Sequence, residues 1–317
     1  MTATQKKVGA VRIDVCVCTY RRRELEDTLR SIGAMTVPDN ATVRVIVADN
    51  DVRPSARELV YALAAQLPFQ VVYVHCPASN ISLARNACLD NAVGEYLAFI
   101  DDDSTAAKDW LVELLAAAEM SGADAVLGPV RSVYPDTAPR WMREGDFHST
   151  GPVWVDGEIR TGYSGNVLLR RFSPRIAGRR FSLVLGQTGG EDTEFFTHLH
   201  RAGGMICFAP GAIVHEPVPD NRARFSWLAT RRFRVGQTHG RLLGGARRGT
   251  NIIPQVGLAA TKLAYCALAT AALAFVPVLR NRFALRGTMH AGAISGLLGL
   301  REIRQYGGEP AGRGNAA

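Results

Sequence analysis

The chain contains the stretch Leu97-Ala98-Phe99-Ile100-Asp101-Asp102-Asp103, in which a short apolar run ends in three consecutive acids. The run is aromatic and branched, as expected for an interior strand of a parallel sheet. Ligands of open α/β sheets bind beyond the carboxyl ends of the strands, where these acids fall. Three adjacent carboxylates repel one another unless they share a cation, and such oxygen ligands suit Mg²⁺ or Mn²⁺. The alternative is that one Asp caps a helix starting near Ala106 and the others are solvated.

Strand-like and helix-like segments alternate around this stretch. We expect strands at 13–18, 43–48, 70–75 and 125–127, and helices at 24–31, 55–66, 82–92 and 107–119. This alternation favours right-handed βαβ units and therefore an α/β fold with a Rossmann-like, mostly parallel sheet flanked by helices. A dinucleotide dehydrogenase and a P-loop kinase are disfavoured, because neither glycine-rich phosphate motif is present.

Polar residues end three of the expected strands. They are Thr19-Tyr20, Asp49 and the acid triplet at 101–103. Because the carboxyl ends of parallel strands meet at one edge of a sheet, we expect these residues to line one pocket.

The charge of the chain is unevenly distributed. The net charge is +8, but residues from Asn221 onward carry +13 and residues 1–220 carry −5. The positive end lies beside an apolar region, which an anionic membrane surface or an anionic substrate explains more economically than a nucleic acid. We therefore expect no nucleic-acid partner.

The six cysteines show no Cys-x-x-Cys spacing, and no secretory apolar segment follows Met1. We expect reduced thiols and a catalytic domain on the cytoplasmic side. Cys16 and Cys18 fall on an expected core strand and are interpreted as packing residues.

Five motifs occur in an order and spacing that resembles family 2 glycosyltransferases, which have the GT-A fold. The resemblance covers about residues 11–240. Within the family, the sequence is most similar to bacterial exopolysaccharide enzymes of the succinoglycan glucosyltransferase type. Its motifs are Cys18-Thr19-Tyr20-Arg21-Arg22, Val47-Ala48-Asp49-Asn50, Asn80-Ile81-Ser82-Leu83-Ala84-Arg85-Asn86, Phe99-Ile100-Asp101-Asp102-Asp103 and Gly189-Gly190-Glu191-Asp192-Thr193-Glu194.

The resemblance implies a binding site for a nucleotide-sugar donor. Thr19 and Tyr20 would lie at the uracil, with the Tyr20 ring against the base, unless Tyr20 only covers the core. Asp49 would accept a hydrogen bond from the base, or else cap the helix after Pro54. Arg85 would lie near the base and the diphosphate, or form a surface salt bridge.

The acid triplet would hold a divalent cation, Mn²⁺ or Mg²⁺. Asp103 would bind the metal directly, and Asp101 or Asp102 would hold the ribose hydroxyls or a metal-bound water. His215 follows a late apolar strand, where the family can place a further metal ligand; the alternative is a plain loop residue. Bound metal would neutralise the charge that grows as the nucleotide leaves.

Two further segments are assigned to the donor or the acceptor. Gly165 allows a close backbone approach, and Asn166 would contact sugar hydroxyls, against the alternative of a simple turn. Arg231 and Arg234 lie in a basic cluster that would grip the donor diphosphate or an anionic lipid-linked acceptor, unless it is a solvated helix face.

Glu191 and Asp192 follow two glycines and begin an expected helix at 193–201. The resemblance makes Asp192 the general base that deprotonates the acceptor hydroxyl, with Glu191 as the second candidate or as a group that orients the acceptor. A base is needed because a sugar hydroxyl is a poor nucleophile at neutral pH. Acids at this position are also ordinary partners of a helix dipole.

The C-terminal part is apolar and flanked by arginines. Residues 252–279 contain a single charge, Lys262, and a helix of about 22 residues would rise roughly 33 Å. Arginines on both sides argue against a single span, so we expect a hairpin or interfacial helices, or else a pair packed on protein. The expected organisation is a flexible start at 1–10, a catalytic domain at 11–245, a membrane-associating segment at 246–306 and a disordered tail at 307–317.

The resemblance implies an inverting, metal-dependent hexosyltransferase that uses a nucleotide sugar, with UDP-glucose as the first choice. Its acceptor would be a saccharide on a polyprenyl diphosphate, and the enzyme would lie at the cytoplasmic face of the inner membrane, peripheral or monotopic. The alternatives are a non-enzymatic, basic membrane-surface binding module and a sugar nucleotidylyltransferase. The latter is disfavoured because Tyr20-Arg21-Arg22-Arg23 lacks the glycine of its phosphate loop.

Overall fold

The structure, a computed structural model, describes residues 10–245, 252–301 and 303. The expected flexible start lies outside these residues apart from Ala10, and the expected tail at 307–317 lies wholly outside them. The described chain divides into two compact units. The first unit contains the residues up to Val130, Thr150–Leu183 and Phe195–His215; the second contains Arg131–Ser149, Val184–Glu194 and the residues from Glu216 onward. This division interleaves along the chain, and the predicted boundaries of the catalytic domain and the membrane-associating segment stay predictions.

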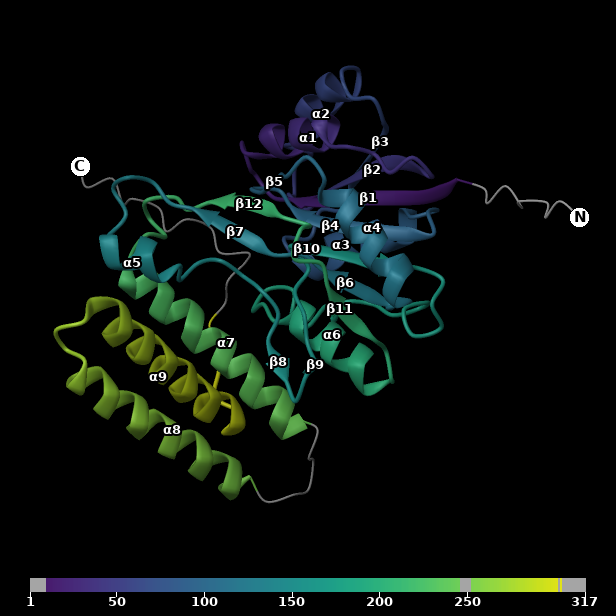
Figure 1. Ribbon diagram of the computed structural model, residues 1–317. Helices are drawn as coiled ribbons and strands as arrows, with labels where there is room; N and C mark the ends of the chain where they lie inside the picture. Colours follow the sequence, from purple (N-terminus) through teal and green to yellow (C-terminus); the bar gives the residue numbers. More distant parts are fainter. Residues whose placement is uncertain (1–9, 246–251, 302, 304–317) are drawn as a thin grey trace, which may run out of the picture. The chain divides into compact units, whose positions relative to one another are not determined.

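A seven-stranded sheet forms the centre of the first unit (Figure 1). Neighbouring strands are parallel except at β10, which runs antiparallel to both β4 and β6. The predicted α/β fold with a mostly parallel sheet is therefore confirmed. The strand order is β11 (Ile206–Phe208), β6 (Ala125–Leu127), β10 (Asn166–Arg170), β4 (Tyr96–Asp101), β1 (Val11–Thr19), β2 (Ala41–Asp49) and β3 (Gln70–His75).

Helices cover both faces of this sheet because its strands are apolar on both sides. Ile13, Val15 and Val17 of β1 face the core shared with α1, α2 and α4, whereas Cys16 faces the core shared with α3 and α6. All six cysteines are free, as expected. The helices are α1 (Leu25–Ala34), α2 (Arg57–Ala64), α3 (Ile81–Asn91), α4 (Trp110–Ser121) and α6 (Glu191–Arg201).

The register of the sheet aligns the carboxyl ends of its central strands. Thr19 pairs with Asp49, Cys18 pairs with Asp101, and Asp49 pairs with His75. The polar residues that end β1, β2 and β4 therefore lie at one edge of the sheet, as predicted from the sequence.

Smaller elements complete the chain. A three-stranded sheet has the order β5 (Thr105–Ala106), β12 (Val214–Pro217) and β7 (Val130–Val133), and β8 (Trp154–Val155) pairs with β9 (Glu158–Ile159) in a hairpin. The hairpin turn is Asp156-Gly157, where both residues have positive φ. This is the turn chemistry that two-residue hairpins prefer.

The second unit contains α5 (Arg140–Gly145), α7 (Phe225–Gly245), α8 (Ile253–Ala272) and α9 (Pro277–Leu297). The helices α7 and α9 touch through their backbones, with each glycine against a backbone carbonyl of the other helix. A Cβ on Gly236 would collide with the Met289 oxygen, and a Cβ on Gly292 would collide with the Phe233 oxygen. Gly240 and Gly296 repeat this contact one turn further on, which is how glycines four residues apart permit close helix packing.

The helix α8 packs against α9 by one side. Cys266 is buried there, and a Cβ on Gly287 would lie 3.3 Å from the Cys266 Cβ. Among the helices of the described residues, none combines the length and the apolar character needed to cross a bilayer.

Candidate active site

The acid triplet lies where β4 ends, as predicted. Asp101 is exposed, Asp102 is buried and Asp103 is half-buried. Gly165 packs directly on Asp101, since a Cβ added at Gly165 would lie 2.5 Å from the Asp101 Oδ2. Only glycine leaves the Asp101 carboxylate in this position, which supports the predicted close backbone approach at Gly165.

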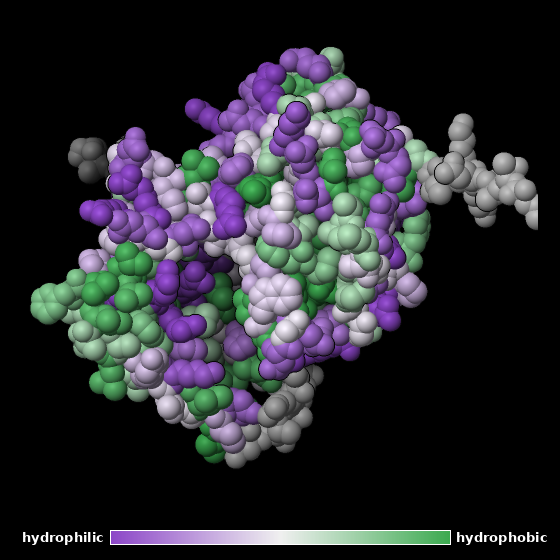
Figure 2. Space-filling view, viewed as in Figure 1, coloured by the Kyte–Doolittle hydropathy of each residue, from purple (hydrophilic) through white to green (hydrophobic). Residues whose placement is uncertain are grey.

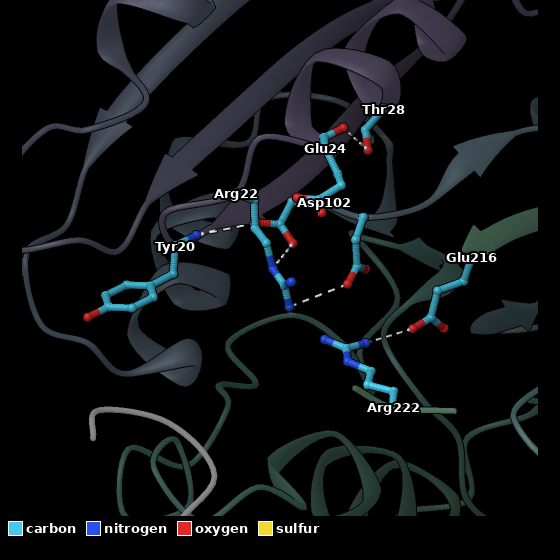
Figure 3. Close-up of polar contacts among 8 residues, drawn as sticks. Tyr20, Arg22, Glu24, Thr28, Asp102, Glu216 and Arg222 are labelled. Atoms are coloured by element: carbon cyan, nitrogen blue, oxygen red, sulfur yellow. Dashed lines mark hydrogen bonds and ion pairs between the residues drawn. The ribbon is translucent and has the colours of Figure 1, made fainter. Parts of the chain in front are cut away.

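Arg22 places a positive charge beside the acid triplet (Figure 3). Its Nη2 lies 3.4 Å from the Asp103 Oδ2, and its Nε lies 3.8 Å from the Asp102 Oδ1. The two acids therefore already share one cationic group, as three neighbouring carboxylates require.

Asp102 is held in an environment that opposes its ionisation. Burial raises the pKa of the Asp102 carboxyl to about 7, and repulsion from Asp103 adds to this effect, while Arg22 opposes it. The Asp102 Oδ2 also accepts a hydrogen bond from the Tyr20 backbone N–H at 3.3 Å, which joins the ends of β1 and β4 (Figure 3).

Tyr20 presents its ring to solvent at this edge, with 37% of the residue exposed, while Thr19 is buried beside it. The Arg21 guanidinium lies 5.2 Å from the centre of the Tyr20 ring and also pairs with Asp51 at 3.0 Å. An open aromatic face at a strand end suits a stacking platform better than a core cover.

Asp49 is fully buried, and three donors point at its carboxylate. The Asp51 N–H donates to Oδ1 at 3.0 Å, while the Ala56 N–H and the Tyr73 hydroxyl donate to Oδ2 at 2.9 and 2.7 Å. These contacts match the alternative role of a cap for the loop and helix after Pro54. In this structure Asp49 organises the β2–α2 loop, and its direct contact with a base stays a prediction.

Arg85 is buried on α3, and its guanidinium lies 5.6 Å from the centre of the Phe181 ring. This burial does not fit the alternative of a surface salt bridge. The helix begins at Asn80, whose side-chain oxygen accepts from the N–H groups of Ser82 and Leu83. That cap fixes the helix, and hence Arg85, relative to the sheet edge.

Asn166 bonds to neighbouring backbone within the core. It is fully buried, its Oδ1 accepts from the Trp110 Nε1 at 2.8 Å, and its Nδ2 donates to the carbonyls of Pro129 and Ala212 at 3.0 and 2.7 Å. Through these bonds Asn166 holds the backbone behind the site, and its contact with sugar hydroxyls stays a prediction.

His215 is exposed on β12 and is brought close to the triplet by strand pairing. His215 pairs with Thr105, two residues beyond Asp103, and its carbonyl accepts from the Thr105 hydroxyl at 3.5 Å. Residues more than one hundred positions apart thus meet at one edge of the first unit.

Glu191 and Asp192 occupy the first turn of α6, in the segment Val184–Glu194 that belongs to the second unit. Gly189 and Gly190 precede them with φ of 85° and 90°, a conformation that glycine adopts at little cost. Glu191 is buried, and the Asp192 Oδ1 accepts from the Thr193 N–H at 2.6 Å. Their convergence with the acid triplet stays a prediction.

Arg231 and Arg234 lie half-buried on α7. The Arg231 guanidinium lies 5.4 Å from the centre of the Trp227 ring, and the Arg234 Nη2 donates to the Thr188 carbonyl at 3.5 Å. Neither residue belongs to a freely solvated helix face, and Arg234 contacts the loop that precedes Glu191.

The donor types at the triplet suit a hard divalent cation, because Asp101 and Asp103 supply carboxylate oxygens and His215 supplies an imidazole. The position taken by Arg22 shows that this edge accommodates positive charge. Within residues 10–245, 252–301 and 303, however, no three His, Cys, Asp or Glu side chains gather closely enough to hold a metal ion.

Comparison with known proteins agrees with this geometry. Residues 14–175 match the model of the family described as Glycosyl transferase family 2, which is about half of the chain. The chain belongs to glycosyltransferase family 2 and is a glycosyltransferase with a GT-A fold. The protein is therefore neither of the two alternatives considered from the sequence, a non-enzymatic binding module and a nucleotidylyltransferase.

Individual relatives narrow the comparison. The chain is 61% identical over 299 residues to the succinoglycan biosynthesis protein ExoM of Rhizobium meliloti (strain 1021), covering 94% of this chain and 96% of the relative. The mannosyltransferase PcManGT from Pyrobaculum calidifontis, in complex with GDP-Man and Mn²⁺, has a TM-score of 0.64 at 20% identity, with 91% and 87% of the two chains covered. S. aureus TarS 1-349 in complex with UDP-GlcNAc has a TM-score of 0.53 at 16% identity, with 89% and 92% covered.

Sequence reasoning missed two residues of this edge. Arg22 was part of a quoted motif but received no role, although three adjacent acids need a positive charge beside them and a basic residue can supply it. Trp110 was also missed; its indole N–H fixes Asn166 across 56 positions of sequence, and no local pattern signals such a contact.

Proposed function

We propose that this enzyme is an inverting glycosyltransferase that moves a hexose from a UDP-sugar, with UDP-glucose as the first candidate, to a lipid-linked oligosaccharide. The pathway is the synthesis of a succinoglycan-type exopolysaccharide. The 61% identity to ExoM supports this pathway, since the alignment covers 94% of this chain and 96% of the relative. The observation that carries the donor site is the alignment of the open Tyr20 ring and the acid triplet at one sheet edge.

The reaction is a single displacement at the anomeric carbon of the donor. The acceptor hydroxyl oxygen forms the new bond while the bond from that carbon to the diphosphate breaks, and UDP leaves with the bonding electrons. Asp192 takes the proton of the hydroxyl, which raises its nucleophilicity. One displacement inverts the configuration at the carbon.

The first unit supplies the donor site in this proposal. Tyr20 stacks on the uracil, Arg85 lies near the base and the diphosphate, and Arg231 and Arg234 of the second unit hold the diphosphate or the anionic acceptor. Asp103, Asp101 and His215 would hold Mn²⁺ or Mg²⁺, and the bound ion would neutralise charge on the departing diphosphate. The Mn²⁺ in the PcManGT complex supports this choice of cation.

The acceptor is proposed to be a saccharide on a polyprenyl diphosphate, and the enzyme to work at the cytoplasmic face of the inner membrane. The support is physical. The second unit carries apolar helices, and the +13 charge from Asn221 onward matches an anionic lipid surface.

Substitution of the proposed base tests the chemistry. In Asp192→Asn, we expect transfer to fall by at least about a hundredfold, because general-base catalysis contributes on that order. UDP affinity and the melting temperature should be unchanged, as measured by calorimetry. Asp136→Asn, the same change at an exposed residue of the second unit, serves as the control. Normal transfer by a folded Asp192→Asn variant would exclude this role for Asp192.

A donor screen tests the substrate. Release of free nucleotide is followed with UDP-glucose, other UDP-hexoses and GDP-mannose in the presence of a lipid-extracted acceptor pool. Acceptor-dependent release from UDP-glucose alone is the expected result, and release from GDP-mannose alone would overturn the donor assignment.

A further inference from the structure

The outer face of α8 is apolar and exposed along its whole length. Leu258, Tyr265 and Leu268 all lie on this face, and Phe275 continues it just beyond the end of the helix. Their spacing of seven, three and seven residues keeps them on one side of a helix. Leu268 is 73% exposed and Phe275 is 97% exposed, so the stripe is open to solvent in this structure.

The opposite side of α8 is already used. Ala259 and Cys266 are buried on that side, and Tyr265, at the border of the open face, has its ring centroid 5.9 Å from that of Phe283 of α9. A helix that is apolar on both its packed side and its open side is typical of burial or of contact with lipid. Twenty helical residues give this stripe a length of about 30 Å. The stripe is therefore an extended apolar surface and not a single exposed leucine.

The charges beside the stripe have one sign. Residues 253–297, which form α8, the turn and α9, contain no acid and four cations: Lys262, Arg280, Arg282 and Arg286. Figure 2 shows hydrophobic side chains gathered over the turn between α8 and α9. An apolar face bordered only by positive charge complements a surface that is apolar inside and negative outside.

We propose that the α8 stripe is a membrane-contact surface that lies in the boundary between headgroups and acyl chains of an anionic phospholipid bilayer. Phe275 and Leu268 enter the apolar layer, and Lys262, Arg280 and Arg286 meet the lipid phosphates, whereas Arg282 is directed at the Gly145 carbonyl and the Phe147 ring. A second copy of the chain is a poorer partner for this surface, because the four cations would face four like charges. This proposal rests on the proposed function only in that a lipid-linked acceptor brings the enzyme to a bilayer.

Vesicle binding tests the proposal on the full chain. The protein is sedimented with vesicles of phosphatidylcholine containing about one third phosphatidylglycerol, and with vesicles of phosphatidylcholine alone. We expect binding to the anionic vesicles, and at least about tenfold weaker binding for the double variant Leu268→Glu/Phe275→Glu. The matched control is the double variant Val93→Glu/Met120→Glu, which adds the same two charges at residues of the first unit that are 50% and 87% exposed.

The outcomes separate cleanly. Equal binding of the double variant and the wild type, or equal binding to both vesicle types, would overturn the proposal. So would a wild-type dimer in solution that the double variant converts to a monomer, because a second copy would then cover the stripe. UDP binding by the wild type is measured in parallel by calorimetry. If the wild type binds the anionic vesicles but does not bind UDP, this result counts against the proposed function alone.

Discussion

At the scale of single residues, the most informative contact is that of Arg22 with Asp102 and Asp103. A guanidinium and a divalent cation are both attracted by these carboxylates, so Arg22 competes with a metal that binds there. A partly exposed ion pair contributes about 0.2–1 kcal/mol, which corresponds to at most about a fivefold change in affinity.

Replacement of Arg22 by glutamine should therefore strengthen Mn²⁺ binding to the protein without nucleotide, by up to about fivefold. Isothermal calorimetry with Mn²⁺ alone measures this effect. The control is Arg23→Gln, which removes a charge from the adjacent exposed residue. Weaker Mn²⁺ binding in Arg22→Gln would mean that Arg22 supports the site and does not compete for it.

At the scale of elements, the contact between α7 and α9 depends on glycines that lie against carbonyls. Gly292→Ala would force a Cβ into the Phe233 oxygen, so the helices would have to separate. We expect a loss of about 1–3 kcal/mol of unfolding free energy, measured by denaturant titration.

The matched control is Gly257→Ala on α8, where a Cβ meets nothing within 4 Å. Alanine has the higher helix propensity, so this variant should gain up to about 1 kcal/mol. If both variants lost stability equally, close packing of α7 on α9 would not be the cause.

His148 predicts how the second unit responds to acid. Its ring stacks on Trp227 at 5.3 Å, its Nδ1 accepts from the Tyr134 hydroxyl at 3.2 Å, and its Nε2 donates to the Arg222 carbonyl at 3.1 Å. Burial lowers the pKa of His148 from 6.5 to about 4, and the positive charges of Arg231 and Arg222 add to this effect.

Between pH 6.5 and 4 the unfolded chain takes up a proton that the folded chain refuses, so stability contributed by neutral His148 is lost as the pH falls through this window. The loss amounts to at most roughly 3 kcal/mol. In His148→Gln, unfolding free energy at neutral pH should be lower, and its difference from the wild type should shrink as the pH approaches 4. A difference that is constant over this range would contradict the assignment.

The regular strands and helices of the first unit were predictable because each has its own periodic signal. The strand at 125–127 and that at 70–75 were predicted with the bounds observed. Strands near β10 and β12 were expected from the resemblance, but their antiparallel pairing was not, and the short β5 and β7 were not predicted, since these pairings depend on residues far away in sequence. The β8–β9 hairpin was missed although Asp156-Gly157 is a strong local signal.

The candidate site also has features that the sequence predicts and features that it does not. Strand-end positions were enough to gather Tyr20 with the acid triplet at one edge. The sequence leaves two uses open for Asp49 and for Asn166, because a polar side chain at the end of a strand is equally able to bind a ligand or to satisfy buried backbone groups. Only the hydrogen-bond partners distinguish these two uses.

At the scale of the whole molecule, the separation of charge along the chain has a consequence for binding to lipid. Residues 1–220 carry −5 and the remainder carries +13, so attraction to an anionic surface acts through the C-terminal part. Exposed charges are screened beyond about 10 Å at 0.1 M salt and beyond about 3 Å at 1 M.

Raising the ionic strength from about 0.05 M to 0.5 M should therefore weaken binding to the anionic vesicles by at least about tenfold. Pelleted protein is compared with UDP affinity in the same buffers, which should change much less because donor recognition includes the Tyr20 platform. Salt-independent binding to vesicles would mean that the cations of α8 and α9 make no contribution.

Because glycines bring the backbones of α7 and α9 into direct contact, neither helix can open locally without the other. Amide hydrogens of α7 and α9 at this seam should exchange with deuterium only when the three-helix bundle opens together, so neighbouring positions on both helices would share one protection factor. Amides on the open side of α8 have no such partner and would exchange through local fraying, which gives this bundle one slow face and one fast face.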